Sequence, residues 1–121
     1  MWLPLLGLLL GVLLGLSSPL VLPIGYASYM AIAILAALDS VFGGVRAGLE
    51  EKYDNTVFIS GFFINIVAAT LLTYLGAKLG VDLILGATVA FSIRIFTNLG
   101  IIRRHLLEKW RARLNRRKSA L

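Results

Sequence analysis

The sequence predicts an all-α membrane protein: a bundle of four transmembrane helices followed by a C-terminal basic amphipathic helix. Hydrophobic residues make up 59% of the 121 residues and the mean hydropathy is +0.88, far above the usual apolar share of a soluble domain. Each of four apolar segments approaches the ~20 residues that a helix needs to cross the hydrocarbon core. The predicted transmembrane domain is 1–102, with spans over residues 2–17, 24–42, 56–76 and 82–102, and a tail over 103–121.

The first span, 2–17, carries three glycines at i, i+4 and i+8, a spacing that lets another helix approach one face closely. These are Gly7, Gly11 and Gly15, and whether their partner helix is internal or from another subunit stays open. A secretory signal peptide is the competing interpretation. The absence of Lys and Arg before the apolar run, and of a convincing small-x-small cleavage site, favours a retained helix.

The second span, 24–42, is rich in alanine and carries Asp39 near its end. We interpret the residues that follow as a motif at the inner rim of the bundle, which breaks the apolar run. It leads into a mixed-charge segment over 45–55, which is either a loop or a short surface helix. The inner-rim motif consists of Gly43, Gly44 and Arg46.

The third and fourth spans also place small and polar residues on common faces. In 56–76, Gly61 and Asn65 are four residues apart, and in 82–102 one stripe at i+4 spacing holds Gly86, Ala90, Arg94 and Asn98. We therefore expect Gly61 and Gly86 to be helix-packing positions, as small residues are in membrane bundles.

The tail, 103–121, carries eight Lys and Arg against Glu108, whereas the rest of the chain carries four basic residues against five acidic ones. An apolar stripe at helical spacing suits a helix that lies on an anionic inner leaflet. We expect no nucleic-acid partner, because a membrane-tethered helix already has lipid phosphates beside it. The residues expected at the lipid surface are Arg103, Arg104, Lys109, Trp110, Arg111, Arg113, Arg116, Arg117 and Lys118.

The distribution of Lys and Arg predicts the orientation. Four spans put both termini and the 45–55 loop on one side of the membrane. That side then holds ten of the twelve basic residues, and Lys78 lies on the other side. The positive-inside rule makes the basic side cytoplasmic.

Four polar residues inside the spans form a predicted intramembrane cluster: Asp39, Asn65, Arg94 and Asn98. Charges at membrane depth are costly and persist when they are paired or line a cavity. We expect Arg94 to pair with Asp39, directly or through Asn98, and expect two layers, Asp39 with Asn98 and Asn65 with Arg94. The cluster is either a structural clamp, which we favour, or a solute or proton site. Arg46 either forms a second pair with Asp39 or is an ordinary loop arginine.

Enzyme chemistry finds little support in the sequence. There are no cysteines, and the single histidine, His105, has no second metal ligand nearby. No serine has a histidine partner within a plausible span, so no nucleophilic site is recognisable. We expect no metal, no cofactor and no catalysis.

Three stretches carry a family resemblance: AILAALDSVFGGVRAGLEEKYD, FISGFFINIVAATLLTYLGAKLGVDL and AFSIRIFTNLGIIRRHLLEKW. They are similar to the bacterial "small basic protein" family, of unknown function, and the similarity covers residues 1–110. It implies an integral membrane protein of bacteria, often encoded near cell-division genes. Together with the predicted spans and orientation, we expect a multi-pass protein of the bacterial cell membrane with both termini cytoplasmic. The matching motif positions, to which the family assigns no role, are Asp39, Gly43, Gly44, Arg46, Asn65, Arg94 and Asn98.

Two functions are consistent with these features. The first is a non-enzymatic integral membrane scaffold or adaptor, linked to cell division or envelope assembly, with protein partners in the membrane or cytoplasm or a second copy of itself. The alternative is a small transporter or solute-binding membrane subunit, with its site at Asp39, Arg94 and Asn98.

Overall fold

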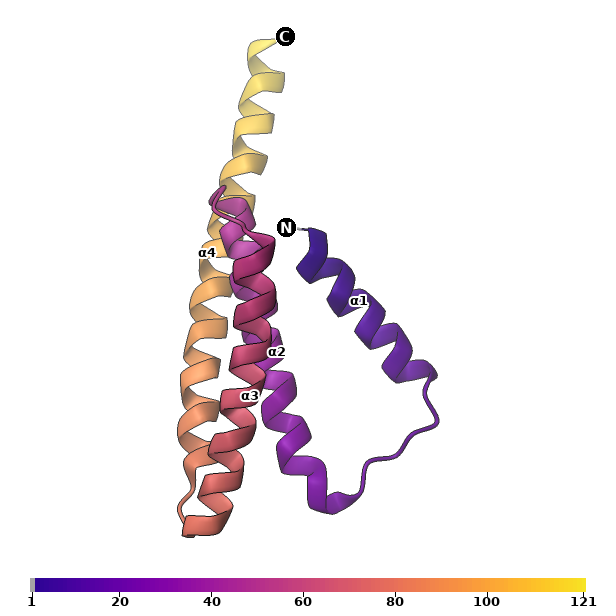
Figure 1. Cartoon of the computed structure of the whole chain (residues 1–121). Helices are drawn as coiled ribbons and strands as arrows, with labels where there is room; N and C mark the ends of the chain where they lie inside the picture. The colour runs from indigo at the N-terminus through magenta and orange to yellow at the C-terminus, as the bar shows by residue number, and fades with distance from the viewer. Residues whose placement is uncertain (1) are drawn as a thin grey trace.

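The computed structural model describes residues 2–121, and all regular structure in this range is helical (Figure 1). Three segments, Ile24–Leu49, Asn55–Leu79 and Leu83–Ser119, are long and apolar enough to cross a membrane. The first helix has 16 residues and is shorter, so the all-helical fold is confirmed and a fourth span stays a prediction. The elements are α1 (Trp2–Ser17), the short 3-10 helix η1 (Ile24–Tyr26), α2 (Ala27–Leu49), α3 (Asn55–Leu79) and α4 (Leu83–Ser119).

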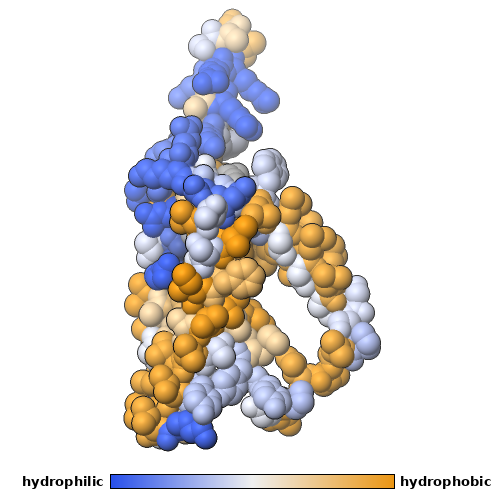
Figure 2. Space-filling view, in the orientation of Figure 1, coloured by the Kyte–Doolittle hydropathy of each residue, from blue (hydrophilic) through white to orange (hydrophobic). Residues whose placement is uncertain are grey.

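Helices α2, α3 and α4 pack side by side as a three-helix bundle (Figure 1). Its core is built from small side chains, which let helix backbones come close together. Large apolar side chains cover the outside of the bundle and α1 (Figure 2), a surface that hydrocarbon solvates without cost. The buried cluster consists of Ile32, Ala36, Ala69 and Ala87, with Leu35, Ile66, Ile84 and Phe91 packed around it.

Helix α1 diverges from the bundle and approaches it at one end (Figure 1). Pro4 is the buried residue of α1, and it contacts α2 at Gly44. A Cβ atom at residue 44 would lie 2.8 Å from Cγ of Pro4 and 3.0 Å from Cδ2 of Phe58. Gly44 therefore makes room where α1, α2 and α3 meet.

The inner-rim motif does not end the second helix as predicted. Helix α2 continues through Gly43 and Gly44 to Leu49, so that the first part of the predicted 45–55 loop is helical. The chain then turns with a positive φ of 58° at Glu51. Asp54 starts α3 by accepting a hydrogen bond from the backbone N–H of Val57 at 3.0 Å. Glycine disfavours a helix in water, but the packed neighbours of Gly44 stabilise it here.

The connection between α3 and α4 is a tight turn. Gly80 ends α3 in the left-handed conformation with φ 66°, which glycine adopts without strain. Val81 folds back so that its N–H donates to the carbonyl of Gly76 at 3.1 Å, and a Cβ at residue 76 would lie 2.7 Å from the Val81 oxygen. Asp82 caps α4 by accepting from Leu85 N–H at 3.0 Å.

Helix α4 runs for 37 residues without a break, which corresponds to about 55 Å at 1.5 Å per residue. Its last part, residues 103–119, projects beyond the other helices (Figure 1) and is hydrophilic (Figure 2); we call it the basic extension. The predicted separate helix on the membrane surface is not confirmed, because the boundary at 102/103 falls inside α4. The apolar side chains of the extension, such as Leu106 and Trp110, are exposed.

Candidate functional site

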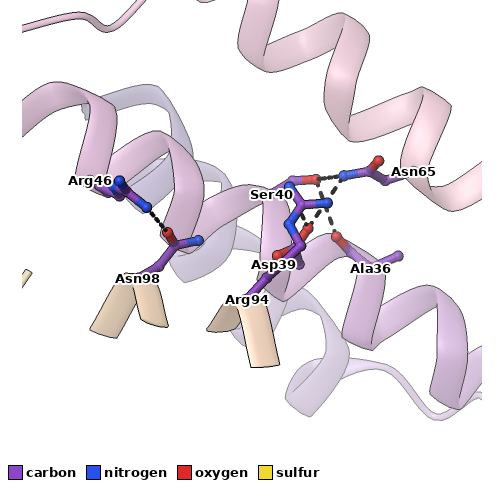
Figure 3. A network of polar contacts seen from close by, with 7 residues as sticks. All are labelled: Ala36, Asp39, Ser40, Arg46, Asn65, Arg94 and Asn98. Atoms are coloured by element: carbon purple, nitrogen blue, oxygen red, sulfur yellow. Dashed lines mark hydrogen bonds and ion pairs between the residues drawn. The ribbon is translucent and has the colours of Figure 1, made fainter. Parts of the chain in front are cut away.

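The polar residues of the spans meet at one end of the bundle, which we call the basic end. It is formed by the last turns of α2, the first turns of α3 and the part of α4 before the basic extension. Asp39 is fully buried in α2, and its Oδ2 lies 3.3 Å from Nη2 of Arg94 on α4 (Figure 3). The predicted pairing of these two residues is confirmed and is direct.

Helix α3 joins the same cluster through an amide. Nδ2 of Asn65 donates to Oγ of Ser40 at 3.0 Å and, at 3.5 Å, to Oδ2 of Asp39. Ser40 in turn donates to the carbonyl of Ala36 at 3.1 Å (Figure 3). One carboxylate thus connects three helices, which fixes their relative positions.

Asn98 belongs to a second cluster, closer to the loop. Its Oδ1 accepts from Nη1 of Arg46 at 3.1 Å, and Nε of Arg46 donates to Oε1 of Glu50 at 3.1 Å. Arg46 therefore does not make the considered pair with Asp39. Seven residues separate them on a continuous helix, about 10 Å along its axis.

The predicted layers were also wrong, because the second helix continues beyond its predicted end at residue 42. Because α2 ends at Leu49, Asp39 lies ten residues from the helix end, and Asn65 lies ten residues from the start of α3. The two residues are therefore at the same depth and hydrogen bond. The observed layers are Asp39 with Asn65 and Arg94, and Asn98 with Arg46.

Two open cavities adjoin these clusters. The first, of about 380 Å³, lies between α2 and α4, and we call it the α2–α4 cavity. The second, of about 200 Å³, lies between α2 and α3 and is lined by Asp39, Asn65 and Tyr53, among others. Both are lined by Gly43, Ala47, Lys52 and Arg94, so they are neighbours. The α2–α4 cavity is lined by Gly43, Arg46, Ala47, Glu50, Lys52, Arg94, Thr97 and Asn98.

Two buried polar atoms in the second cavity lack a hydrogen-bond partner among residues 2–121. They are Oδ1 of Asp39 and the hydroxyl of Tyr53. Burial raises the pKa of the Tyr53 hydroxyl, and the negative charge of the adjacent Asp54 raises it further. Tyr53 was not among the predicted site residues, because nothing in the sequence distinguishes it from an ordinary interfacial tyrosine.

The predicted helix-packing glycines make no close contact within the described chain. A Cβ atom at Gly7, Gly11, Gly15, Gly61 or Gly86 would meet nothing within 4 Å. The tight glycine positions are Gly44 and Gly76 instead. Regular i+4 spacing marks a face without side chains, but it carries no information on whether another helix covers it.

An apolar groove of about 620 Å³ separates α1 from α2 and α3. Gly7, Gly11 and Val12 line it on α1, Val41 on α2 and Phe62 on α3. We call it the α1 groove. Its residues carry no ionisable group, so it suits an apolar occupant.

No three His, Cys, Asp or Glu side chains within residues 2–121 lie close enough together to hold a metal ion. The two clusters offer hydrogen-bond donors, hydrogen-bond acceptors and charges, which are the groups that bind a polar ligand. The predicted lipid-surface residues lie in the basic extension, where they are exposed.

Comparison of the sequence with known proteins identifies the family of this chain. A family model described as "Protein of unknown function (DUF1290)" matches residues 22–107. The chain is 49% identical over 121 residues to "Small basic protein" of Bacillus subtilis (strain 168), covering 100% of both chains. It is 43% identical over 101 residues to uncharacterized proteins of Mycobacterium tuberculosis (strain ATCC 25618 / H37Rv) and Mycobacterium bovis, covering 82% of this chain and 84% of theirs. No solved structure matches the chain. The chain therefore belongs to the small basic protein family, a family of unknown function.

Proposed function

We propose that the protein is a non-enzymatic scaffold in the bacterial cell membrane, in which the α1 groove receives a transmembrane helix of a partner protein. The partner would belong to an envelope or division assembly, as the gene neighbourhood of similar proteins suggests. One observation carries the proposal: α1 stands off from the bundle and leaves an apolar groove of about 620 Å³ beside its uncovered glycines.

The physics of helix association in lipid supports this use of the groove. Lipid tails are as apolar as leucine, so helices associate through close packing, which small residues allow. Gly7 and Gly11 line the groove and have no neighbour within 4 Å of a Cβ position. Because α1 is anchored near Pro4 and diverges from there, a second helix fits beside its glycine face without displacing a packed contact.

The basic extension supports the same proposal, because it adds a second surface that lies outside the bundle (Figure 1). With both termini cytoplasmic, the basic extension continues α4 out of the bundle, and its first basic residues, Arg103 and Arg104, lie nearest the inner leaflet, where each contributes about 1 kcal/mol of attraction to anionic lipid. The outer face of the extension then stays available to a cytoplasmic protein. The scaffold would thus present one surface within the membrane and one outside it.

Site-directed photocrosslinking in native membranes tests the groove. The photoreactive residue p-benzoylphenylalanine replaces Val12, which lines the groove, or Phe96, which is exposed on α4. We expect a discrete protein adduct from position 12 and none from position 96; an adduct with a second copy would identify the partner as the protein itself.

Two glycine variants sharpen this test. Gly11→Leu fills the groove and should abolish the adduct. Gly86→Leu lies on α4, outside the groove, and should preserve it. The two variants are comparable, because a Cβ atom at either glycine would meet nothing within 4 Å. Identical adducts from positions 12 and 96, or an adduct that survives Gly11→Leu, would rule the groove out as the partner site.

A solute-binding membrane subunit is the second candidate, favoured by the α2–α4 cavity that Arg94 and Asn98 line. Of the binding and transport roles, binding fits better, because the apolar core around Ala36 and Ala69 lies between the two ends of the bundle. Native mass spectrometry of protein released from its own membranes would test this: retention of a small molecule supports the site, and a bare chain argues against it.

A further inference from the structure

We propose that the α2–α4 cavity is a phosphate-binding site, which takes either the headgroup phosphate of an inner-leaflet lipid or a free phosphate ion. The inference rests on the solute-binding candidate and names its ligand class. It is independent of the α1 groove, which lies between α1, α2 and α3 and shares no residue with this cavity.

The charge of the cavity favours an anion. Three cationic side chains, Arg46, Lys52 and Arg94, line it against one carboxylate, that of Glu50. Asp39, which pairs with Arg94, is fully buried behind it and does not line this cavity. Because Glu50 pairs with Arg46 and Asp39 pairs with Arg94, three positive charges stand against two negative ones, and the remaining net charge of +1 beside this open cavity favours an anion.

Arg94 and Lys52 have donors to spare. The side chain of Arg94 is 59% exposed although it pairs with buried Asp39, and that pair engages Nη2. Lys52 forms no ion pair with any residue in the range 2–121. Both side chains can therefore turn N–H groups toward a ligand without giving up a structural contact.

Asn98 offers a further free donor to the cavity. Only 6% of this residue is exposed, and its Oδ1 already accepts from Arg46. Its amide nitrogen has no acceptor among residues 2–121 and points away from Arg46 (Figure 3). This nitrogen is not one of the fully buried atoms that lack a partner, so it is accessible from the cavity that Asn98 lines, and an oxygen-rich ligand there can accept its free N–H.

A phosphate matches this set of donors. Donors come from α2 (Arg46), the loop (Lys52) and α4 (Arg94 and Asn98), and a phosphate offers acceptor oxygens in several directions. Guanidinium groups bind such oxyanions in paired hydrogen bonds. The cavity volume of about 380 Å³ lies within the ~300–1,000 Å³ of small-molecule sites, so a phosphate and a substituent both fit. The position at the basic end, near the predicted lipid headgroups, makes a lipid phosphate an available ligand.

Calorimetric titration of the full-length protein in a neutral detergent tests the site. The probes are inorganic phosphate, dioctanoyl phosphatidylglycerol, and dioctanoylglycerol as a matched molecule without phosphate. We expect binding of at least one phosphate probe and none of dioctanoylglycerol. Binding of phosphatidylglycerol alone assigns the site to a lipid headgroup, and binding of inorganic phosphate assigns it to the free ion as well.

Charge variants identify the residues. Lys52→Gln should weaken binding about tenfold, the size of one lost charge-assisted hydrogen bond, while Lys118→Gln in the basic extension should leave it unchanged. Glu50→Gln removes the carboxylate that lines the cavity and should tighten binding, an effect that a structural role of Glu50 would not produce. Circular dichroism of each variant verifies that the helices are intact.

The proposal fails if neither phosphate probe binds, or if Lys52→Gln and Lys118→Gln weaken binding equally, since that marks general attraction to a basic chain. A different small molecule retained in native mass spectrometry would keep the solute site while overturning its phosphate class. The adduct from Val12 in the α1 groove is expected in either case, so the two proposals fail separately.

Discussion

Nη2 of Arg94 lies 3.3 Å from Oδ2 of Asp39, and the two side chains differ sharply in exposure: that of Asp39 is fully buried and that of Arg94 is 59% exposed. The carboxylate therefore receives its charged partner from the edge of the bundle. The arginine at the edge lines both cavities and keeps free donors there, whereas the buried carboxylate depends on the pair and on Asn65. The two partners should consequently respond differently to substitution.

Arg94→Gln should destabilise the bundle strongly, because it leaves a buried carboxylate without a positive partner. Breaking a buried pair costs about 3–5 kcal/mol, and we expect about 1–3 kcal/mol here because Arg94 is largely exposed and screened. Thermal or denaturant unfolding in detergent, followed by circular dichroism, measures the loss.

A double variant, in which Asp39→Asn is added to Arg94→Gln, provides the matched control for this pair. The double variant Asp39→Asn/Arg94→Gln should be more stable than Arg94→Gln alone, since it removes the unpaired charge while it keeps the side-chain shapes. Equal stability of Arg94→Gln and the wild type would show that the pair does not clamp the helices. A double variant that folds normally while function is lost would point to a functional site instead.

Gly44→Ala should loosen the contact between α1 and the bundle. The added methyl group would lie 2.8 Å from Cγ of Pro4 and 3.0 Å from the Phe58 ring, an overpacking that typically costs about 1–3 kcal/mol. Gly43→Ala is the control in the same helix, because its nearest neighbour would be the Asn98 amide nitrogen at 3.8 Å. Disulfide trapping between engineered cysteines on α1 and α2 should become less efficient in Gly44→Ala and stay efficient in Gly43→Ala.

Removal of residues 106–121 should leave the bundle intact. These residues are exposed and make no tertiary hydrogen bond or ion pair with the rest of residues 2–121, so we expect a change in unfolding free energy within about 0.5 kcal/mol. Unfolding in neutral detergent measures it. A large loss would mean that the basic extension supports the bundle, contrary to its exposure.

Tyr53 should titrate later than an ordinary tyrosine. Burial and the neighbouring charge of Asp54 raise the pKa of its hydroxyl above 10.0. In the unfolded chain the hydroxyl loses its proton first, so the folded state loses stability as the pH rises from about 10 toward the raised value. The absorbance difference at high pH between wild type and Tyr53→Phe isolates this group, and a midpoint at or below 10 would contradict the burial of the hydroxyl.

Much of the fold follows from local properties of the sequence. The bounds of α1 match the prediction, and the helical spans, the apolar surface and the pairing of Asp39 with Arg94 follow from hydropathy and from the cost of charge in lipid. The depth of Asp39 did not follow, because a glycine pair after an apolar run predicts a helix end. Tertiary packing of Gly44 against Pro4 and Phe58 overrides the weak helix propensity of glycine.

The sequence by itself determined that the chain is helical and apolar along three long helices, and basic at one end, because composition and periodicity act residue by residue. Only the tertiary structure decided which glycines touch a neighbour, which polar residues share a depth, and that Arg46, Lys52 and Arg94 surround one cavity. Those properties depend on where helices end and how they are rotated against one another. Contacts between distant segments fix both, and a local pattern does not encode them.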